Sequence, residues 1–162
     1  MKTVLAASLL AMLISVPALA QDKTEADAVK DFVEFAYPRI TTFEPSQGDP
    51  ALQKRIRYFA DEKALSAYVD AKTADGTIAL VFGKGGQAID DIISKVSVSD
   101  RGNGDWQADF IARHKSLGPG VEDAECISVR LGLKAMPLGP GISPVAIDTV
   151  TTKPSKVKCP VD

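Results

Sequence analysis

The chain has 162 residues, of which 45% are hydrophobic and 25% are charged, and its formal net charge at pH 7 is −2. This length and composition suit one globular domain with a hydrophobic core. The slightly acidic balance argues against nucleic acid as a partner, because nucleic-acid-binding domains normally present a basic face. With a single histidine and two cysteines, the chain lacks the ligands of a typical zinc site, and no motif indicates a cofactor.

The N-terminus has the features of a cleaved secretory signal. Lys2 precedes a mostly apolar run, and Ala18-Leu19-Ala20 matches an A-x-A cleavage site. The run is shorter than the roughly 20 apolar residues of a membrane-spanning helix. We therefore expect removal of residues 1–20, which leaves a single periplasmic or secreted domain over residues 21–162 that begins near Gln21.

A first helix is predicted to begin after Thr24, an N-cap residue, with Asp27 completing a capping box. It is expected to run to about Ala36 and to end before Pro38, because proline disrupts a helix interior. Its apolar stripe consists of Val29, Phe32, Val33 and Ala36.

A second helix is predicted from Asp49, a good N-cap, and Pro50, which suits the first helical position. Apolar and basic side chains separate onto opposite faces, with Leu52, Ile56 and Phe59 on one and Lys54, Arg55 and Arg57 on the other. We interpret the basic face as solvent-exposed. Binding of an anion or an acidic partner is the alternative.

The stretch from Tyr58 to Val69 predicts a third helix. Asp61 is its N-cap, and Glu62 places negative charge at the positive end of the helix dipole. The apolar residues that recur at helical spacing are Ala64, Leu65, Tyr68 and Val69. We expect them to face the core, between a helical first half and a strand-forming second half of the chain.

Strands are predicted over most of the remaining chain. Thr77–Phe82 is rich in β-branched and aromatic residues and indicates a first strand. The run Gly83–Gly86 lacks the spacing of a phosphate-binding loop, so a flexible hairpin turn is the better interpretation. Ile89–Val98 fits either a helix or a strand, although the alternation in Val96–Ser99 favours a strand at its end.

Three further strands have clearer patterns. Asn103-Gly104 signals a hairpin, and the run from Trp106 to His114 then alternates apolar and polar residues with one exception. Ile127–Leu133 places apolar residues on one face, and Val145–Thr152 is rich in valine, isoleucine and threonine. Three helices followed by four or five antiparallel strands indicate an α+β domain in which the helices cover one face of the sheet.

Cys126 and Cys159 are the two cysteines of the sequence. In an oxidising compartment they are expected to form one disulfide, which would tie the C-terminal tail to the strand that contains Cys126. Two metal ligands are a poorer interpretation, because no cluster of histidines or further cysteines accompanies them.

Few residues are candidates for catalysis. His114 titrates near neutral pH when unperturbed, and it lies at the end of an apolar strand face. Asp90, Asp91 and Asp109 are carboxylates close to it in sequence, but their spacing does not mark an acid–base pair. Ser116 lacks the Gly-x-Ser-x-Gly context of a nucleophile elbow. We therefore expect no enzyme, with Asp109 and His114 as weak candidates for polar groups of a pocket.

Five short segments follow each other in a distinctive order: the helix entry Tyr58–Glu62, the strand Lys95–Ser99, the tryptophan strand Gly104–Ala108, the apolar strand Ile127–Leu133 and the closing strand Gly141–Ile147. Together they resemble the periplasmic domain of the DotI/IcmL family of type IVB secretion proteins. The resemblance implies a nuclear-transport-factor-2-like cone, in which three N-terminal helices pack on a curved antiparallel sheet of four to five strands. It also implies a role in assembly rather than catalysis.

These features predict a non-enzymatic exported interaction domain that associates with itself or with protein partners in the cell envelope. It would be an accessory protein or paralogue of a type IV secretion component. A small-ligand-binding or isomerase-type function through Asp109 and His114 is an alternative, because the mouth of such a cone is a natural pocket. A secreted inhibitor or immunity protein that covers a partner enzyme is another.

Overall fold

The computed structural model describes residues 24–46, 53–136 and 144–159. Within these residues the helical elements are α1 (Glu25–Thr41), the 3-10 helix η1 (Lys54–Tyr58), α3 (Glu62–Ala74) and the π-helix η2 (Ala79–Gly83). The strands are β1 (Gln87–Ile92), β2 (Ser97–Gly102), β3 (Asp105–Gly118), β4 (Val121–Ala135) and β5 (Val145–Pro154). The predicted signal peptide and the predicted helix start at Asp49 and Pro50 lie outside the described residues.

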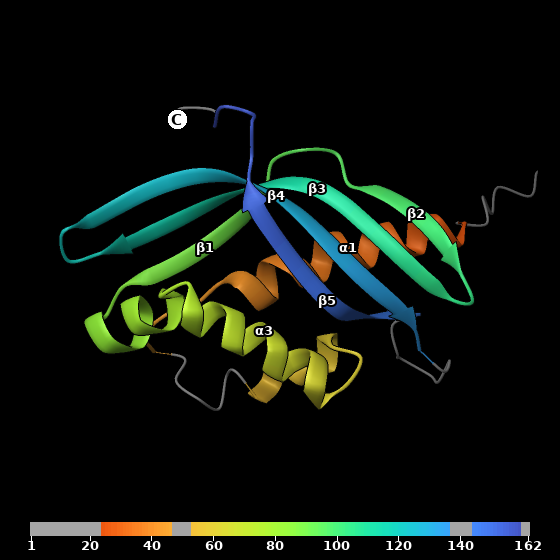
Figure 1. Cartoon of the computed structure of the whole chain (residues 1–162), viewed down its shortest axis with the longest axis horizontal. Helices are drawn as coiled ribbons and strands as arrows, with labels where there is room; N and C mark the ends of the chain where they lie inside the picture. The colour runs from red at the N-terminus through yellow and green to blue at the C-terminus, as the bar shows by residue number, and fades with distance from the viewer. Residues whose placement is uncertain (1–23, 47–52, 137–143, 160–162) are drawn as a thin grey trace, which may run out of the picture.

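The five strands form one antiparallel sheet around the long β3–β4 hairpin. β1 pairs with the second half of β3, β2 pairs with its first half, and β5 pairs with β4. The sheet is strongly curved, and α1 and α3 lie on the same side of it (Figure 1). Helices followed by an open antiparallel sheet confirm the predicted α+β class.

The core fills the concave side of this curved sheet. Alternate residues of the central strands are buried there, namely Ala108, Phe110 and Ala112 of β3 and Val129, Leu131 and Leu133 of β4. From the helices, Tyr37 packs edge-on against Phe110, with 4.8 Å between the ring centroids. Tyr68 of α3 lies near the rings of Phe43 and Phe59 and is buried, as the sequence pattern predicts.

Most predicted boundaries are confirmed. Thr24 caps α1 with a complete capping box to Asp27, and the Asp61 side chain accepts a hydrogen bond from the backbone N–H of Ala64 at the start of α3. The β2–β3 hairpin turns at Asn103, which has a positive φ of 59°. The ambiguous segment Ile89–Val98 contains the end of β1 and the start of β2, joined by a short connection.

The predicted end of the first helix before Pro38 is wrong, because α1 continues to Thr41. An interior proline removes one helical hydrogen bond and its ring crowds the carbonyl four residues earlier, so a continuation past it needs other forces that favour the helix. Here the last turn buries Ile40 completely. The carbonyl of Pro38 also accepts hydrogen bonds from the backbone N–H and the hydroxyl of Thr42. Burial and capping of this turn outweigh the local signal of the proline.

The predicted strand Thr77–Phe82 is also wrong, because this segment is helical and ends in η2. The backbone N–H of Thr77 donates to Asp75, and Gly76 adopts a positive φ of 86°, so the chain turns and begins a new helical segment after α3. Val81 is then completely buried in the core. Tertiary burial here overrides the β propensity of the segment. The run Gly83–Gly86 connects this helix to β1 and is not a hairpin turn.

Arg55 contradicts the prediction of a solvent-exposed basic face. It is 4% exposed, whereas Ile56 of the predicted apolar face is 36% exposed. The guanidinium donates hydrogen bonds to the carbonyls of Ile40 and Thr42, and it lies 4.5 Å from the centroid of the Phe43 ring. It thereby satisfies carbonyl groups at the C-terminal end of α1 that the helix itself cannot pair.

Replacing Arg55 with methionine is expected to lower the free energy of unfolding by about 2–3 kcal/mol, because buried carbonyls lose hydrogen bonds from a charged donor. Urea unfolding measures the change. The matched control is Lys54→Met, at an exposed position of the same short helix, which should change stability little. Equal stabilities of the two variants would contradict the capping role of Arg55.

A disulfide joins Cys126 of β4 to Cys159 in the C-terminal tail. The backbone N–H of Ser155 donates to the carbonyl of Cys126, so the tail crosses β4 where β5 ends. The two cysteines are 33 residues apart in sequence. The bond therefore restricts a substantial loop in the unfolded chain and adds stability in the chain-entropy model.

Loss of this disulfide is expected to lower the free energy of unfolding by about 3–4 kcal/mol, as the loop length implies. The comparison is between the wild-type protein and the Cys126→Ala/Cys159→Ala variant in urea unfolding, each with and without reductant. Reductant should destabilise the wild type and leave the variant unchanged. An unchanged wild type under full reduction would refute the stabilising role.

Candidate functional site

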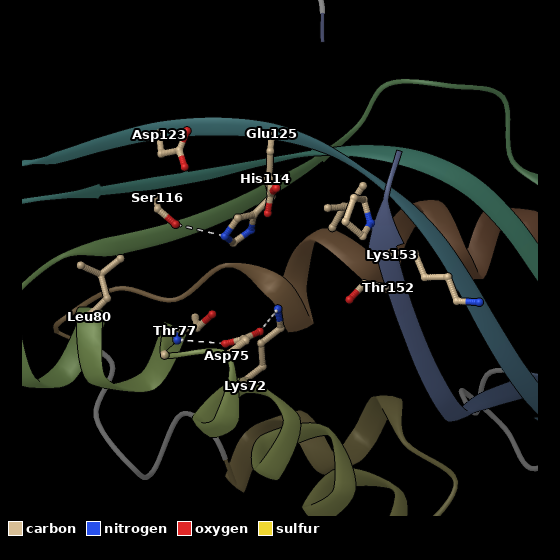
Figure 2. Close-up of a pocket in the computed structure, with 13 residues that line it drawn as sticks. Lys72, Asp75, Thr77, Leu80, His114, Ser116, Asp123, Glu125, Thr152 and Lys153 are labelled. Atoms are coloured by element: carbon tan, nitrogen blue, oxygen red, sulfur yellow. Dashed lines mark hydrogen bonds and ion pairs between the residues drawn. The ribbon is translucent and has the colours of Figure 1, made fainter. Parts of the chain in front are cut away.

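A cavity of about 360 Å³ lies between the C-terminal end of α3 and the concave side of the sheet. Its lining residues come from the end of α3, the segment that follows it, η2 and three strands: Lys72, Asp75, Gly76, Thr77, Leu80, His114, Ser116, Asp123, Glu125, Ile127, Thr152, Lys153 and Pro154. Figure 2 shows the side chains of His114 and Ser116 above those of Lys72 and Asp75. The volume lies within the range of small-molecule pockets, which is about 300–1,000 Å³.

The sheet register creates a buried polar network beside this cavity. Asp90 of β1 and His114 of β3 are direct cross-strand partners. The carboxylate of Asp90 is 1% exposed, and its Oδ1 lies 2.6 Å from Nδ1 of His114. The hydroxyl of Tyr37, from α1, donates to Oδ2 of the same carboxylate at 2.7 Å. A buried carboxylate needs such partners, because its desolvation is otherwise very costly.

His114 connects this network to the cavity. The hydrogen bond with Asp90 raises the pKa of His114 above its ordinary value, against the opposing effect of burial. Its other ring nitrogen, Nε2, lies 3.1 Å from Oγ of Ser116. When the ring is protonated, both nitrogens donate, so Ser116 accepts from Nε2 and its own hydroxyl proton is available to another acceptor.

Lys72 and Asp75 form the opposite wall. The ammonium of Lys72 lies 3.1 Å from Oδ2 of Asp75, and the Lys72 side chain is 10% exposed. Burial raises the pKa of Asp75, but hydrogen bonds from Thr77 together with the charge of Lys72 outweigh it and hold the pKa below its ordinary value. This wall therefore presents a shielded ion pair to the cavity.

Asp109 and His114, the two weak candidates from the sequence, are not brought together. Oδ1 of Asp109 is bound to Arg130 Nε at 2.7 Å, and Oδ2 accepts from Gln107. Asp109 alternates with the buried residues Ala108 and Phe110 and thus lies on the opposite face of β3. The partner of His114 is Asp90, which the sequence offers only as one of several nearby carboxylates.

Two site residues had weak signals in the sequence. Asp90 follows Ala88 on the inner face of β1, so a carboxylate occupies a position that alternation assigns to the core. Lys72 follows Leu65 and Tyr68 at helical spacing, on the buried face of α3. In both cases the signal is a charged residue at a position where the sequence pattern predicts a buried one.

The order Asp90, His114, Ser116 matches that of a nucleophilic triad. The carboxylate of a triad orients the histidine and stabilises its protonated form, and Asp90 likewise raises the pKa of His114 through their hydrogen bond.

The His114–Asp90 pair predicts a pH dependence of stability. Because the folded-state pKa of His114 is raised, its contribution is fully present below the unfolded value of about 6.5 and is lost as the pH rises through the folded value. Unfolding free energies measured between about pH 6 and 9 should therefore decline for the wild type. The His114→Gln variant should lack this step. A wild-type profile parallel to that of the variant would contradict the assignment.

Comparison with known proteins gives likeness in structure only. No protein-family model and no curated protein matches the sequence. Among solved structures, an IcmL-like type IV secretion system protein from Legionella pneumophila is 16% identical with a TM-score of 0.70, over 82% of this chain and 95% of that one. The periplasmic domain of DotI is 12% identical with a TM-score of 0.70, over 83% and 99%.

CagV from Helicobacter pylori, described as a VirB8 homolog of a type IV secretion system, is 9% identical with a TM-score of 0.62, over 80% of this chain and 98% of that one. At these identities the likeness concerns the fold. The chain has the α+β fold found in the periplasmic domains of type IV secretion proteins, the fold that its sequence motifs predict.

Proposed function

We propose that this chain is an exported protein-interaction domain of the cell envelope, an accessory protein or paralogue of a type IV secretion component. The observation that carries the proposal is the shared fold, which extends over 95% and 99% of the IcmL-like protein and the DotI domain. The shared fold therefore covers nearly the whole of both solved structures, which supports a comparable role for this domain.

Export is part of this proposal. The sequence features of a cleavable signal precede the domain, and the mature chain is proposed to begin near Gln21. Among the residues that the structure describes, no helix is long and apolar enough to cross a membrane.

A surface around Phe35 supports a role in binding proteins. Phe35 of α1 is 51% exposed, and Ile56 of η1 is 36% exposed. Arg39 lies over the Phe35 ring at 3.7 Å, and Arg57 lies 4.9 Å from the ring centroid of Tyr58, which itself contacts Phe35 edge-on. Aromatic residues and arginine are enriched at protein–protein interfaces. We call Phe35, Arg39, Ile56 and Arg57 the Phe35 surface.

Site-specific photo-crosslinking in the native host tests the proposal. A photoreactive amino acid at position 35 should give adducts with proteins of the secretion envelope or with a second copy of this chain. The matched control is position 157, because Val157 is equally apolar and 53% exposed but lies outside the Phe35 surface. Deletion of the chain should also lower substrate transfer by the host's type IV system, and complementation with the intact chain should restore it.

The Phe35→Ser/Ile56→Ser variant should complement the deletion poorly, whereas Val157→Ser should complement it fully. Recovery of a free monomer alone after crosslinking at both positions, together with unchanged transfer in the deletion strain, would refute the proposed function.

A further inference from the structure

The inner part of the cavity beside His114 holds two basic groups, each paired with a carboxylate: Lys72 with Asp75 and His114 with Asp90. The ammonium of Lys72 and the ring of His114 come from opposite walls, the helix and the sheet (Figure 2). Their charges interact: the hydrogen bond with Asp90 raises the pKa of His114, whereas the charge of Lys72 lowers it. The ammonium of Lys72 has three N–H donors, of which Asp75 takes one, so it can also donate to an anionic group in the cavity.

Hydroxyl groups complete this inner part as a site for a carboxylate. When the His114 ring is protonated, Ser116 accepts from its Nε2 and can donate its own proton into the cavity. Thr77 also lines the cavity, next to Asp75. A carboxylate between Lys72 and Ser116 would gain charge-assisted hydrogen bonds, which are about twice as strong as neutral ones.

Strand β4 brings two acidic side chains to the cavity, and β5 brings the basic Lys153. Glu125 of β4 is the cross-strand partner of His114, and Asp123 is the partner of Ser116. Directly opposed residues of an antiparallel pair point to the same face, so both carboxylates lie on the cavity side. In the part of the chain that the structure describes, neither of them forms a hydrogen bond or an ion pair. They are positioned to receive an ammonium group.

Apolar side chains also contribute to the cavity. Leu80, Ile127 and Pro154 line the same cavity. A short aliphatic side chain would cover them and be removed from water, which contributes about 25 cal/mol for each Å² of apolar surface buried.

We propose that this cavity binds a small zwitterion with an aliphatic side chain, of the class of the α-amino acids, with its carboxylate at Lys72 and Ser116 and its ammonium at Glu125 and Asp123. This inference goes beyond the proposed interaction function and does not rest on it. If the chain binds amino acids but does not join an envelope complex, the proposed ligand site is supported and the proposed interaction function is refuted.

Three compounds of similar shape separate the contributions of the two charges. L-leucine carries both, 4-methylpentanoate lacks the ammonium, and 3-methylbutylamine lacks the carboxylate. Titration into the mature protein, followed by two-dimensional NMR of backbone amides, should give the tightest binding for leucine, with shifts at His114, Ser116 and Thr77. Equal affinity for all three compounds, or no shift at these residues with any of them, would overturn the proposal.

Two variants locate the charges. Lys72→Met should weaken the binding of leucine and of 4-methylpentanoate about tenfold and should not weaken that of 3-methylbutylamine, because Asp75 loses its cationic partner. Glu125→Gln should weaken the binding of leucine and of 3-methylbutylamine about threefold, since an exposed ion pair contributes less. The binding of 4-methylpentanoate should not change. Glu125 is exposed, so this variant is expected to fold even if loss of the buried Lys72 ammonium destabilises the protein.

Lys63→Met is the matched control, because Lys63 is an exposed residue of α3 that does not line the cavity. It should bind all three compounds like the wild type. If Glu125→Gln retains wild-type affinity for leucine, or if Lys63→Met loses as much affinity as Lys72→Met, the proposed orientation of the ligand is wrong.

Discussion

The pairing of β3 with β4 is the constraint on which the rest of the domain depends. Every other strand hydrogen-bonds to one of these two, and their register decides which side chains face the helices. A shift of β4 by one residue against β3 would turn Leu131 toward solvent and bury Arg130 in its place. Because both strands are long, the same register also extends beyond the apolar core and aligns His114 with Glu125.

The core and the candidate site are two parts of one concave face. Near the middle of β3 the face is apolar and is covered by α1, with Tyr37 against Phe110. Toward the end of β3 the same face carries His114 and Ser116 and borders a cavity. Tyr37 belongs to both parts, because its ring packs in the core and its hydroxyl binds Asp90. Burial raises the pKa of Tyr37, with Asp90 adding to the effect, so the hydroxyl stays a donor.

Local sequence signals failed where long-range contacts opposed them. Pro38 predicted a helix end, but burial of Ile40 and the hydrogen bonds of Thr42 continue α1 for another turn. Thr77–Phe82 has the composition of a strand, yet the turn at Gly76 and the burial of Val81 make it helical. Arg55 resembled a surface residue because its partners, the carbonyls at the end of α1, are distant in sequence.

The sequence by itself determined the α+β class, the capped start of α1 and of α3, the alternation in β3 and β4, and the resemblance to DotI/IcmL periplasmic domains, because these depend on local periodicity, capping and short motifs. It also supplied the two cysteines that the structure joins. Only the tertiary structure decided that His114 pairs with Asp90 rather than with Asp109. Strand pairing sets that choice, and it depends on the register of β1 against β3, which neither strand encodes alone.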